Sequence, residues 1–176
     1  MIFAPTPLPG LMLVRAEWRN DARGGFARAF CEAEFAAAGL PTRFPQCNLS
    51  VNAQRGTVRG MHLQADPWPE GKLVRCVAGA VFDVAVDLRP GSPTRGRWHG
   101  VELTAEGGDA FWIPPGFAHG FQALSDGATL FYMMTESYRP GAERGVRFDD
   151  PAFGIAWPLP PAHVAEKDRS WPDFVP

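Results

Sequence analysis

Short stretches in which apolar and polar residues alternate follow one another along most of the chain, as in half-buried β-strands. The sharpest is residues 81–88, in which Phe82 and Val84 alternate with Asp83 and Asp87. Because side chains alternate across a strand, one face of this segment should pack in a core and the other should meet polar groups. The pattern predicts strands at 11–18, 26–30, 44–51, 57–63, 72–77, 80–88, 97–103, 109–113, 119–124 and 129–137.

One helix interrupts this series of strands. Residues 31–38 are rich in Ala and Glu and are followed by Gly39, which suits the left-handed cap of a helix. The 19 glycines and 18 prolines are scattered between short apolar runs, which favours tight turns and many short strands. We therefore expect an all-β sandwich or barrel that forms a single domain over residues 1–176.

The last part of the chain, beyond Tyr138, is irregular, with one short helical turn expected near 166–169. It contains Trp157, Trp171 and Phe174. Because large aromatic side chains are usually covered, this tail should pack on the barrel.

Composition and charge narrow the class of partner. With 17 Lys and Arg against 19 Asp and Glu, the net charge of -2 gives no general attraction to nucleic acid or to an anionic membrane. Small molecules are the expected partners. The three cysteines are an odd number without a C-x-x-C pair, which predicts neither a disulfide framework nor a zinc site. No signal peptide and no 18-residue apolar stretch is evident, so we expect a cytoplasmic protein.

Candidate chemistry begins in the segment 59–75, which brings together Arg59, His62, Lys72 and Arg75. Buried cations need partners, so this crowding suggests an anion pocket with a base and a cation at its reactive end. On a regular strand Arg59 and His62 would lie on opposite faces. The alternative is a hairpin in which His62 is a hydrogen-bonded core residue and the cations are solvated.

A second candidate is the corner at 114–116, Pro-Pro-Gly, which delivers His119 to the start of the next strand. This corner resembles the second motif of the cupins, jelly-roll barrels that often bind metal. The four histidines include no His-x-His pair, however, and Lys72 would repel a cation. We therefore expect no metal site and no other cofactor.

Both tyrosines of the chain lie in one segment, Tyr132 and Tyr138. They are six residues apart, so on a regular strand they share a face, where a phenol could donate a proton. They could equally be strand aromatics with solvated hydroxyls. In the tail, Asp168 could reach His62 and hold its tautomer, although most acids in such a tail face water.

The order of these segments resembles the dTDP-4-dehydrorhamnose 3,5-epimerase family of deoxysugar-nucleotide epimerases. The likeness extends over nearly the whole chain, and it rests on many motifs in one order rather than on any single motif. The matching segments are 21–26, 46–50, 59–62, 71–75, 82–89, 91–94, 114–121, 138–140, 155–158 and 166–168.

The resemblance implies a cupin-like jelly-roll homodimer, free of metal, that inverts C3, C5 or both of a 4-keto-6-deoxyhexose on a nucleoside diphosphate. In the family pattern His62 is the base, Asp168 orients it, Lys72 stabilises the enolate oxygen and Tyr132 returns the proton. This division of labour suits the chemistry, because removal of a hydrogen α to a ketone needs a base, a charge at the oxyanion and an acid. Substrate contacts are implied for Arg23, Phe26, Arg28, Gln46, Asn48, Arg59, His119, Tyr138, Glu143 and Lys167.

Three positions depart from the family pattern. Arg28 stands where a Glu usually helps to recognise the nucleoside, Leu63 replaces an aromatic residue, and Arg95 stands where Phe is common. Because the charge at position 28 is reversed, the sequence does not decide which nucleotide carries the sugar. Two other function classes remain: a non-catalytic jelly roll that binds a sugar or nucleotide, and a metal-dependent cupin.

Overall fold

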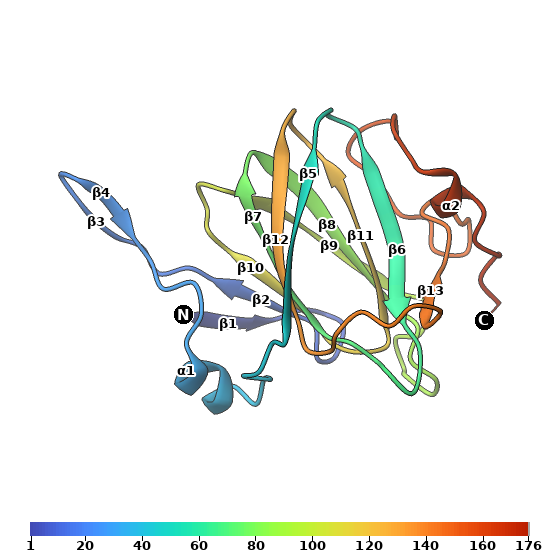
Figure 1. Cartoon of the computed structure of the whole chain (residues 1–176), viewed down its shortest axis with the longest axis horizontal. Coiled ribbons are helices and arrows are strands. Elements are labelled where there is room, and N and C mark those ends of the chain that lie inside the picture. Colours follow the sequence, from blue (N-terminus) through green and yellow to red (C-terminus); the bar gives the residue numbers. More distant parts are fainter. Residues whose placement is uncertain (176) are drawn as a thin grey trace.

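The computed structural model describes residues 1–175 (Figure 1), and antiparallel strands dominate it. Residues 1–175 contain no helix that is long and apolar enough to cross a membrane. The elements are β1 (Ile2–Pro5), β2 (Met12–Arg15), β3 (Arg19–Asp21), β4 (Gly24–Phe26), α1 (Glu32–Ala37), β5 (Gln46–Asn52), β6 (Val58–Gln64), β7 (Lys72–Ala78), β8 (Ala80–Asp87), β9 (Trp98–Thr104), β10 (Ala110–Ile113), β11 (Phe117–Ala123), β12 (Ala128–Met134), β13 (Glu143–Gly145) and α2 (Glu166–Arg169).

Two sheets form the cupin-like jelly roll. One has six strands in the order β1-β2-β10-β7-β12-β5, and the other has five in the order β13-β6-β11-β8-β9. The main core lies between them, since its buried residues come from both sheets, among them Val74 and Phe111 from the first and Val81 and Phe121 from the second. The all-β prediction is confirmed, and so are the eight strands expected between residues 44 and 137, with small differences at their ends.

The short helical turn expected near 166–169 is confirmed as α2, and the helix expected over 31–38 is confirmed as α1. It begins after Cys31 and ends at Ala37, and Gly39 has the positive φ of +70° expected for a left-handed cap. Its Phe35 is fully buried against the rings of Phe3, Phe30 and Phe44. This aromatic cluster fixes the helix on the six-stranded sheet.

The first 30 residues differ from the sequence prediction. A strand was expected over 11–18, but β2 ends at Arg15, and β1 before it was not expected. Residues 26–30 do not form a strand of their own; instead β3 and β4 make a small hairpin that projects from the body of the molecule (Figure 1). Every residue of this hairpin is exposed. The alternation of apolar and polar residues in this part of the sequence therefore does not correspond to a buried and an exposed face within this chain.

Strand β8 was expected to be half-buried, but both of its faces are buried. Val81 and Ala85 face the core between the sheets, together with Asp83 and Asp87. The opposite face, with Val84 and its neighbours, is covered by side chains that the tail contributes: Ile155, Trp157 and Phe174. The predicted packing of the tail on the barrel is therefore confirmed.

The tail closes one edge of the five-stranded sheet. β13 pairs with β6 through Glu143 and Gln64, and farther along the same strand Val164 forms a parallel bridge with Val58. A paired edge strand cannot recruit another chain. The same pairing places the short helix α2 beside β6.

Asp87, at the end of β8, organises the loop that follows. Its fully buried carboxylate accepts hydrogen bonds from Arg89 (2.7 Å), Ser92 (2.6 Å) and Thr94 (2.6 Å). Burial alone would raise the pKa of Asp87, but these donors outweigh it and hold the pKa well below its ordinary value. Loss of the charge should therefore loosen this loop.

We predict that Asp87→Asn lowers the free energy of unfolding near neutral pH by about 2–4 kcal/mol, because an amide oxygen cannot accept from all these donors. Since the pKa of Asp87 is depressed in the folded state, its stabilisation is complete above the unfolded value of 3.8 and is lost as the pH falls below it. Urea denaturation at neutral and acid pH should show a steeper acid decline for the wild type than for the variant.

Asp149→Asn is the matched control, because this exposed carboxylate pairs with Arg147 at the surface. Its effect on the free energy of unfolding should stay within about 1 kcal/mol. Equal acid declines for the wild type and Asp87→Asn would contradict the role given to Asp87.

Candidate active site

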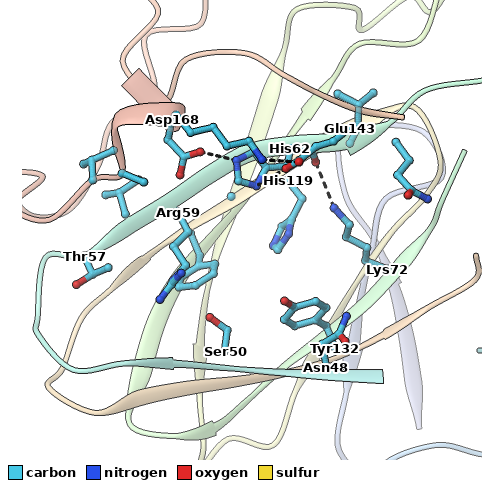
Figure 2. A pocket seen from close by; sticks show the side chains of 18 of the residues that line it. Asn48, Ser50, Thr57, Arg59, His62, Lys72, His119, Tyr132, Glu143 and Asp168 are labelled. Carbon is cyan, nitrogen blue, oxygen red and sulfur yellow. Dashed lines mark hydrogen bonds and ion pairs between the residues drawn. The ribbon is translucent and has the colours of Figure 1, made fainter. Parts of the chain in front are cut away.

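A cavity of about 1070 Å³ opens between the two sheets and is closed on one side by the tail (Figure 2). One wall comes from β5 and β12 of the six-stranded sheet, and the opposite wall from β6 and β11 of the five-stranded sheet. The cavity gathers side chains far apart in the sequence. The candidate residues that line it are Gln46, Asn48, Arg59, His62, Lys72, His119, Tyr132, Tyr138, Glu143, Lys167 and Asp168.

Strand β6 is irregular where it enters the cavity. The pairing of β6 with β11 shifts register between His119 and Phe121, and Gly60 has a φ of +124°. A side chain at Gly60 would collide with the backbone of β11, so only glycine fits this close approach. As a result Arg59 and His62 both line the cavity (Figure 2). The prediction that they lie on opposite faces was wrong, because it assumed a regular strand.

His62 is held by a carboxylate from the tail. Asp168 Oδ1 lies 2.5 Å from His62 Nε2, and Asp168 Oδ2 accepts the backbone N–H of Gly60 at 3.1 Å. Asp168 is only 3% exposed. Burial would raise the pKa of Asp168, but the hydrogen bond and charge of His62 and the Gly60 N–H together lower it. An ionised Asp168 makes Nε2 the protonated nitrogen and leaves Nδ1 free to accept a proton.

A second carboxylate lies near the free nitrogen of His62. Glu143 Oε1 is 3.9 Å from His62 Nδ1, and the other oxygen of Glu143 pairs with the ammonium of Lys167. The imidazolium that forms when Nδ1 takes a proton would therefore lie between two negative groups. Both Asp168 and Lys167 belong to α2, so one turn of the tail supplies two charges to the site.

Lys72, the first residue of β7, points its ammonium towards the cavity beneath β6 (Figure 2). Its Nζ donates to the carbonyl oxygen of His62 at 3.2 Å and contacts Glu70 Oε1 at 3.1 Å. Glu70 was not among the residues expected from the sequence. The sequence did contain one signal for it: Glu70 is a carboxylate two residues before Lys72, the residue at which β7 begins.

Tyr132 stands on β12, in the wall opposite His62. Burial raises the pKa of the Tyr132 phenol; the charge of Arg59 opposes this and that of Glu70 adds to it. The phenol is therefore protonated at neutral pH and can act as an acid. Figure 2 shows Lys72 between the His62 and Tyr132 sides of the cavity.

Other polar residues of the cavity are held in place by hydrogen bonds with neighbouring residues. Arg59 is oriented by Asn52, whose Oδ1 accepts from Arg59 Nε at 2.8 Å. His119 Nε2 lies 3.0 Å from the buried Asp83 of β8. His119 is therefore a polar group of the kind that the Asp-bearing face of β8 was expected to meet. Tyr138 is 53% exposed and lies at the cavity mouth, with its backbone N–H bound to Gln46 at 2.9 Å.

Three candidate residues lie outside this cavity, on the hairpin or just after it. Arg23 pairs with Asp21 at 2.6 Å, and Phe26 is 69% exposed. Arg28 pairs with Glu34 at 2.7 Å, beside a separate hollow of about 300 Å³. Within one chain these three residues do not meet His62.

The geometry can support proton transfer. It presents a carboxylate-held imidazole on one wall, a protonated phenol on the other and an ammonium between them. Among residues 1–175, no three His, Cys, Asp or Glu side chains group as metal ligands. His62 and His119 are paired on neighbouring strands, but each faces its own aspartate.

Known proteins resemble this chain over nearly its whole length. A family model described as dTDP-4-dehydrorhamnose 3,5-epimerase matches residues 5–175. The chain is 47% identical over 172 residues to the dTDP-4-dehydrorhamnose 3,5-epimerase of Methanothermobacter thermautotrophicus, which covers 96% of this chain and 92% of that protein.

Solved structures give the same result. The dTDP-4-dehydrorhamnose 3,5-epimerase of Elizabethkingia anophelis NUHP1 superposes with a TM-score of 0.94 and is 38% identical, covering 99% of this chain and 96% of that one. A dTDP-6-deoxy-D-glucose-3,5-epimerase of Legionella pneumophila Philadelphia 1, in complex with dTDP-4-keto-L-rhamnose, has a TM-score of 0.90 and 40% identity, covering 97% and 90%.

Proposed function

The chain belongs to the dTDP-4-dehydrorhamnose 3,5-epimerase family, and from this premise we propose how its residues carry out the epimerisation. The protein is an isomerase that acts on a dTDP-4-dehydro-6-deoxyhexose, converting dTDP-4-dehydro-6-deoxyglucose towards dTDP-4-dehydrorhamnose by inverting C3, C5 or both. We place this activity in one domain, residues 1–176, and in the cytoplasm. The observation that carries the mechanism is the position of His62 and Tyr132 on opposite walls of one cavity.

The reaction begins at His62. Nδ1 removes the hydrogen from the carbon next to the C4 ketone, and the electrons of that C–H bond move to form an enolate with negative charge on the C4 oxygen. Asp168 stabilises the resulting imidazolium through Nε2. Lys72 stabilises the enolate oxygen with its ammonium.

Tyr132 completes the inversion. Its phenol donates a proton to the same carbon from the face opposite His62, which restores the ketone with inverted configuration. The tyrosinate then regains a proton from water and His62 loses its own. These steps use only side chains of the protein and need no metal or organic cofactor.

The nucleotide should lie along the polar part of the cavity. Arg59 offers a guanidinium fork that suits a diphosphate oxygen pair, and Lys167 adds a second cation. Gln46, Asn48, His119, Tyr138 and Glu143 line the same cavity and are proposed to hydrogen-bond the sugar or the nucleoside.

We also propose that the protein is a homodimer in which the hairpin completes the partner's site. Leu49, Val51 and Val77 on the six-stranded sheet are exposed by 67%, 62% and 46%. Their neighbours along each strand face the cavity or the core, so these three form an outer apolar face. A second copy of the chain on this face would let the projecting hairpin deliver Arg23 and Phe26, with Arg28 beside them, to the other cavity.

We predict that incubation with dTDP-4-dehydro-6-deoxyglucose in heavy water places deuterium at C3, C5 or both, measured by NMR. His62→Asn should abolish this exchange, because the base is lost. Tyr132→Phe should still exchange on the His62 side while inversion falls by about 10²-fold or more, as for a lost general acid.

His99→Asn is the matched control, because this histidine lies on β9 and does not line the cavity. It should exchange at the wild-type rate. Wild-type protein that binds the substrate without any exchange would refute the mechanism and favour a binding module instead.

A complementation experiment tests the proposed dimer. Arg23→Ala/Phe26→Ala and His62→Asn should each be nearly inactive alone. Coexpressed, they should recover about a quarter of the wild-type activity, because half of randomly paired dimers are mixed and each mixed dimer has one intact site. A monomeric mass by light scattering, or no recovery in dimers proven to be mixed, would contradict the exchange of hairpins.

A further inference from the structure

Glu70 is a buried carboxylate at the end of the cavity that the mechanism above does not use. It lines the cavity, is only 7% exposed, and makes an ion pair with Lys72 at 3.1 Å. We propose that Glu70 is a positioning residue, which holds Lys72 as a fixed ammonium so that this cation is in place when the enolate forms. The inference rests on the proposed role of Lys72 in the reaction.

The backbone around Glu70 is rigidly placed. Gly71 donates its N–H to Thr135 Oγ1 at 2.7 Å and accepts the Thr135 N–H at 3.0 Å. A Cβ atom at Gly71 would lie 2.5 Å from the Trp112 ring, so no other residue fits at this position without displacing that ring. Glu70 and Lys72, two residues apart, therefore keep a fixed relation.

Burial makes a counter-ion necessary. Lys72 is also 7% exposed, and an isolated ammonium in such a place is costly unless it is paired and hydrogen-bonded. The His62 carbonyl supplies a hydrogen bond but no charge. Glu70 supplies the charge.

Fold stability alone does not account for the Glu70–Lys72 pair. Its second oxygen, Oε2, is buried and has no hydrogen-bond partner among the residues that the structure describes. An unsatisfied buried carboxylate oxygen is destabilising, and a buried ion pair is often no more stable than an apolar pair of the same size. A role in the reaction explains why a carboxylate stands here.

The other two carboxylates that line the cavity are already paired. On β6 and α2, His62 pairs with Asp168, and on β13 Glu143 pairs with Lys167. Across the described part of the chain, Glu70 is the one carboxylate in an ion pair with Lys72. The titratable or charged groups that share the cavity with this pair are Arg59, His62, His119, Tyr132, Tyr138, Glu143, His163, Lys167, Asp168 and Arg169.

The sequence offers a direct test, because Lys72 and Lys167 are the only lysines. Protein labelled with ¹³C-lysine gives two side-chain Cε signals, which Lys167→Arg assigns. We expect the NMR order parameter of the Lys72 side chain to fall in Glu70→Gln, because the carboxylate that lies 3.1 Å from its ammonium is lost. The order parameter of Lys167 should stay unchanged.

Glu143→Gln is the matched control, since it removes the partner of Lys167 in the same way. It should lower the order parameter of Lys167 and leave that of Lys72 unchanged. Glu70→Asp keeps the charge but withdraws it by one methylene, so its Lys72 order parameter should lie between those of the wild type and Glu70→Gln. This variant carries the test if Glu70→Gln fails to fold, as judged by thermal unfolding.

Kinetics separate the proposal from a structural salt bridge. Glu70→Gln should lower kcat by about 10-fold or more and should change KM little, because the charge acts on the transition state. An equally ordered Lys72 in wild type and variant would overturn the assignment, as would a more mobile Lys72 with unchanged kcat. A wild type without epimerase activity would instead refute the proposed function, and the lysine order parameters would still report on the ion pair.

Discussion

The contact between His62 and Asp168 is the constraint on which the site depends. It joins a strand in the middle of the chain to the last helical turn, 106 residues later, at 2.5 Å. The same carboxylate accepts the N–H of Gly60, so Asp168 fixes both the imidazole and the backbone that carries it. The tail is therefore part of the site, because His62 has no orienting partner until the tail is seated.

Charge is distributed around the cavity as pairs. His62 with Asp168 and Lys167 with Glu143 connect β6, α2 and β13, whereas Lys72 with Glu70 joins β7 to the segment just before it. Each pair keeps an ionic group in a partly dry space at low cost, because buried charges persist only with partners. An anionic substrate that enters the cavity therefore meets cations that are already fixed. Groups fixed in advance need no reorganisation during the reaction.

Sequence reasoning succeeded where burial within the chain decides the pattern. β8 and α1 were predictable, because burial within the chain places apolar side chains along β8 and around Phe35. The hairpin β3–β4 was not, since all its residues are exposed in the chain. The irregularity at Gly60 was also missed, because the register shift depends on a close approach to β11 that no local pattern reports.

For the site, the resemblance to the family pointed to residues that local patterns leave ambiguous, such as Asp168 in an otherwise polar tail. It did not point to Glu70, which becomes visible only when its carboxylate is seen against Lys72. Glu70 is only two residues from Lys72, but this spacing alone does not show that the two side chains meet. The pair of His62 with Asp168, in contrast, is long-range and arises from topology.

The most direct test of the account is the tautomer of His62. ¹⁵N-histidine-labelled protein, at a pH where the imidazole is neutral, gives signals for four histidines, and the set that disappears in His62→Asn belongs to His62. The account predicts a proton on Nε2, directed at Asp168, and a bare Nδ1 facing the substrate. A proton on Nδ1 would contradict it, because the nitrogen that must remove the substrate hydrogen would already be occupied.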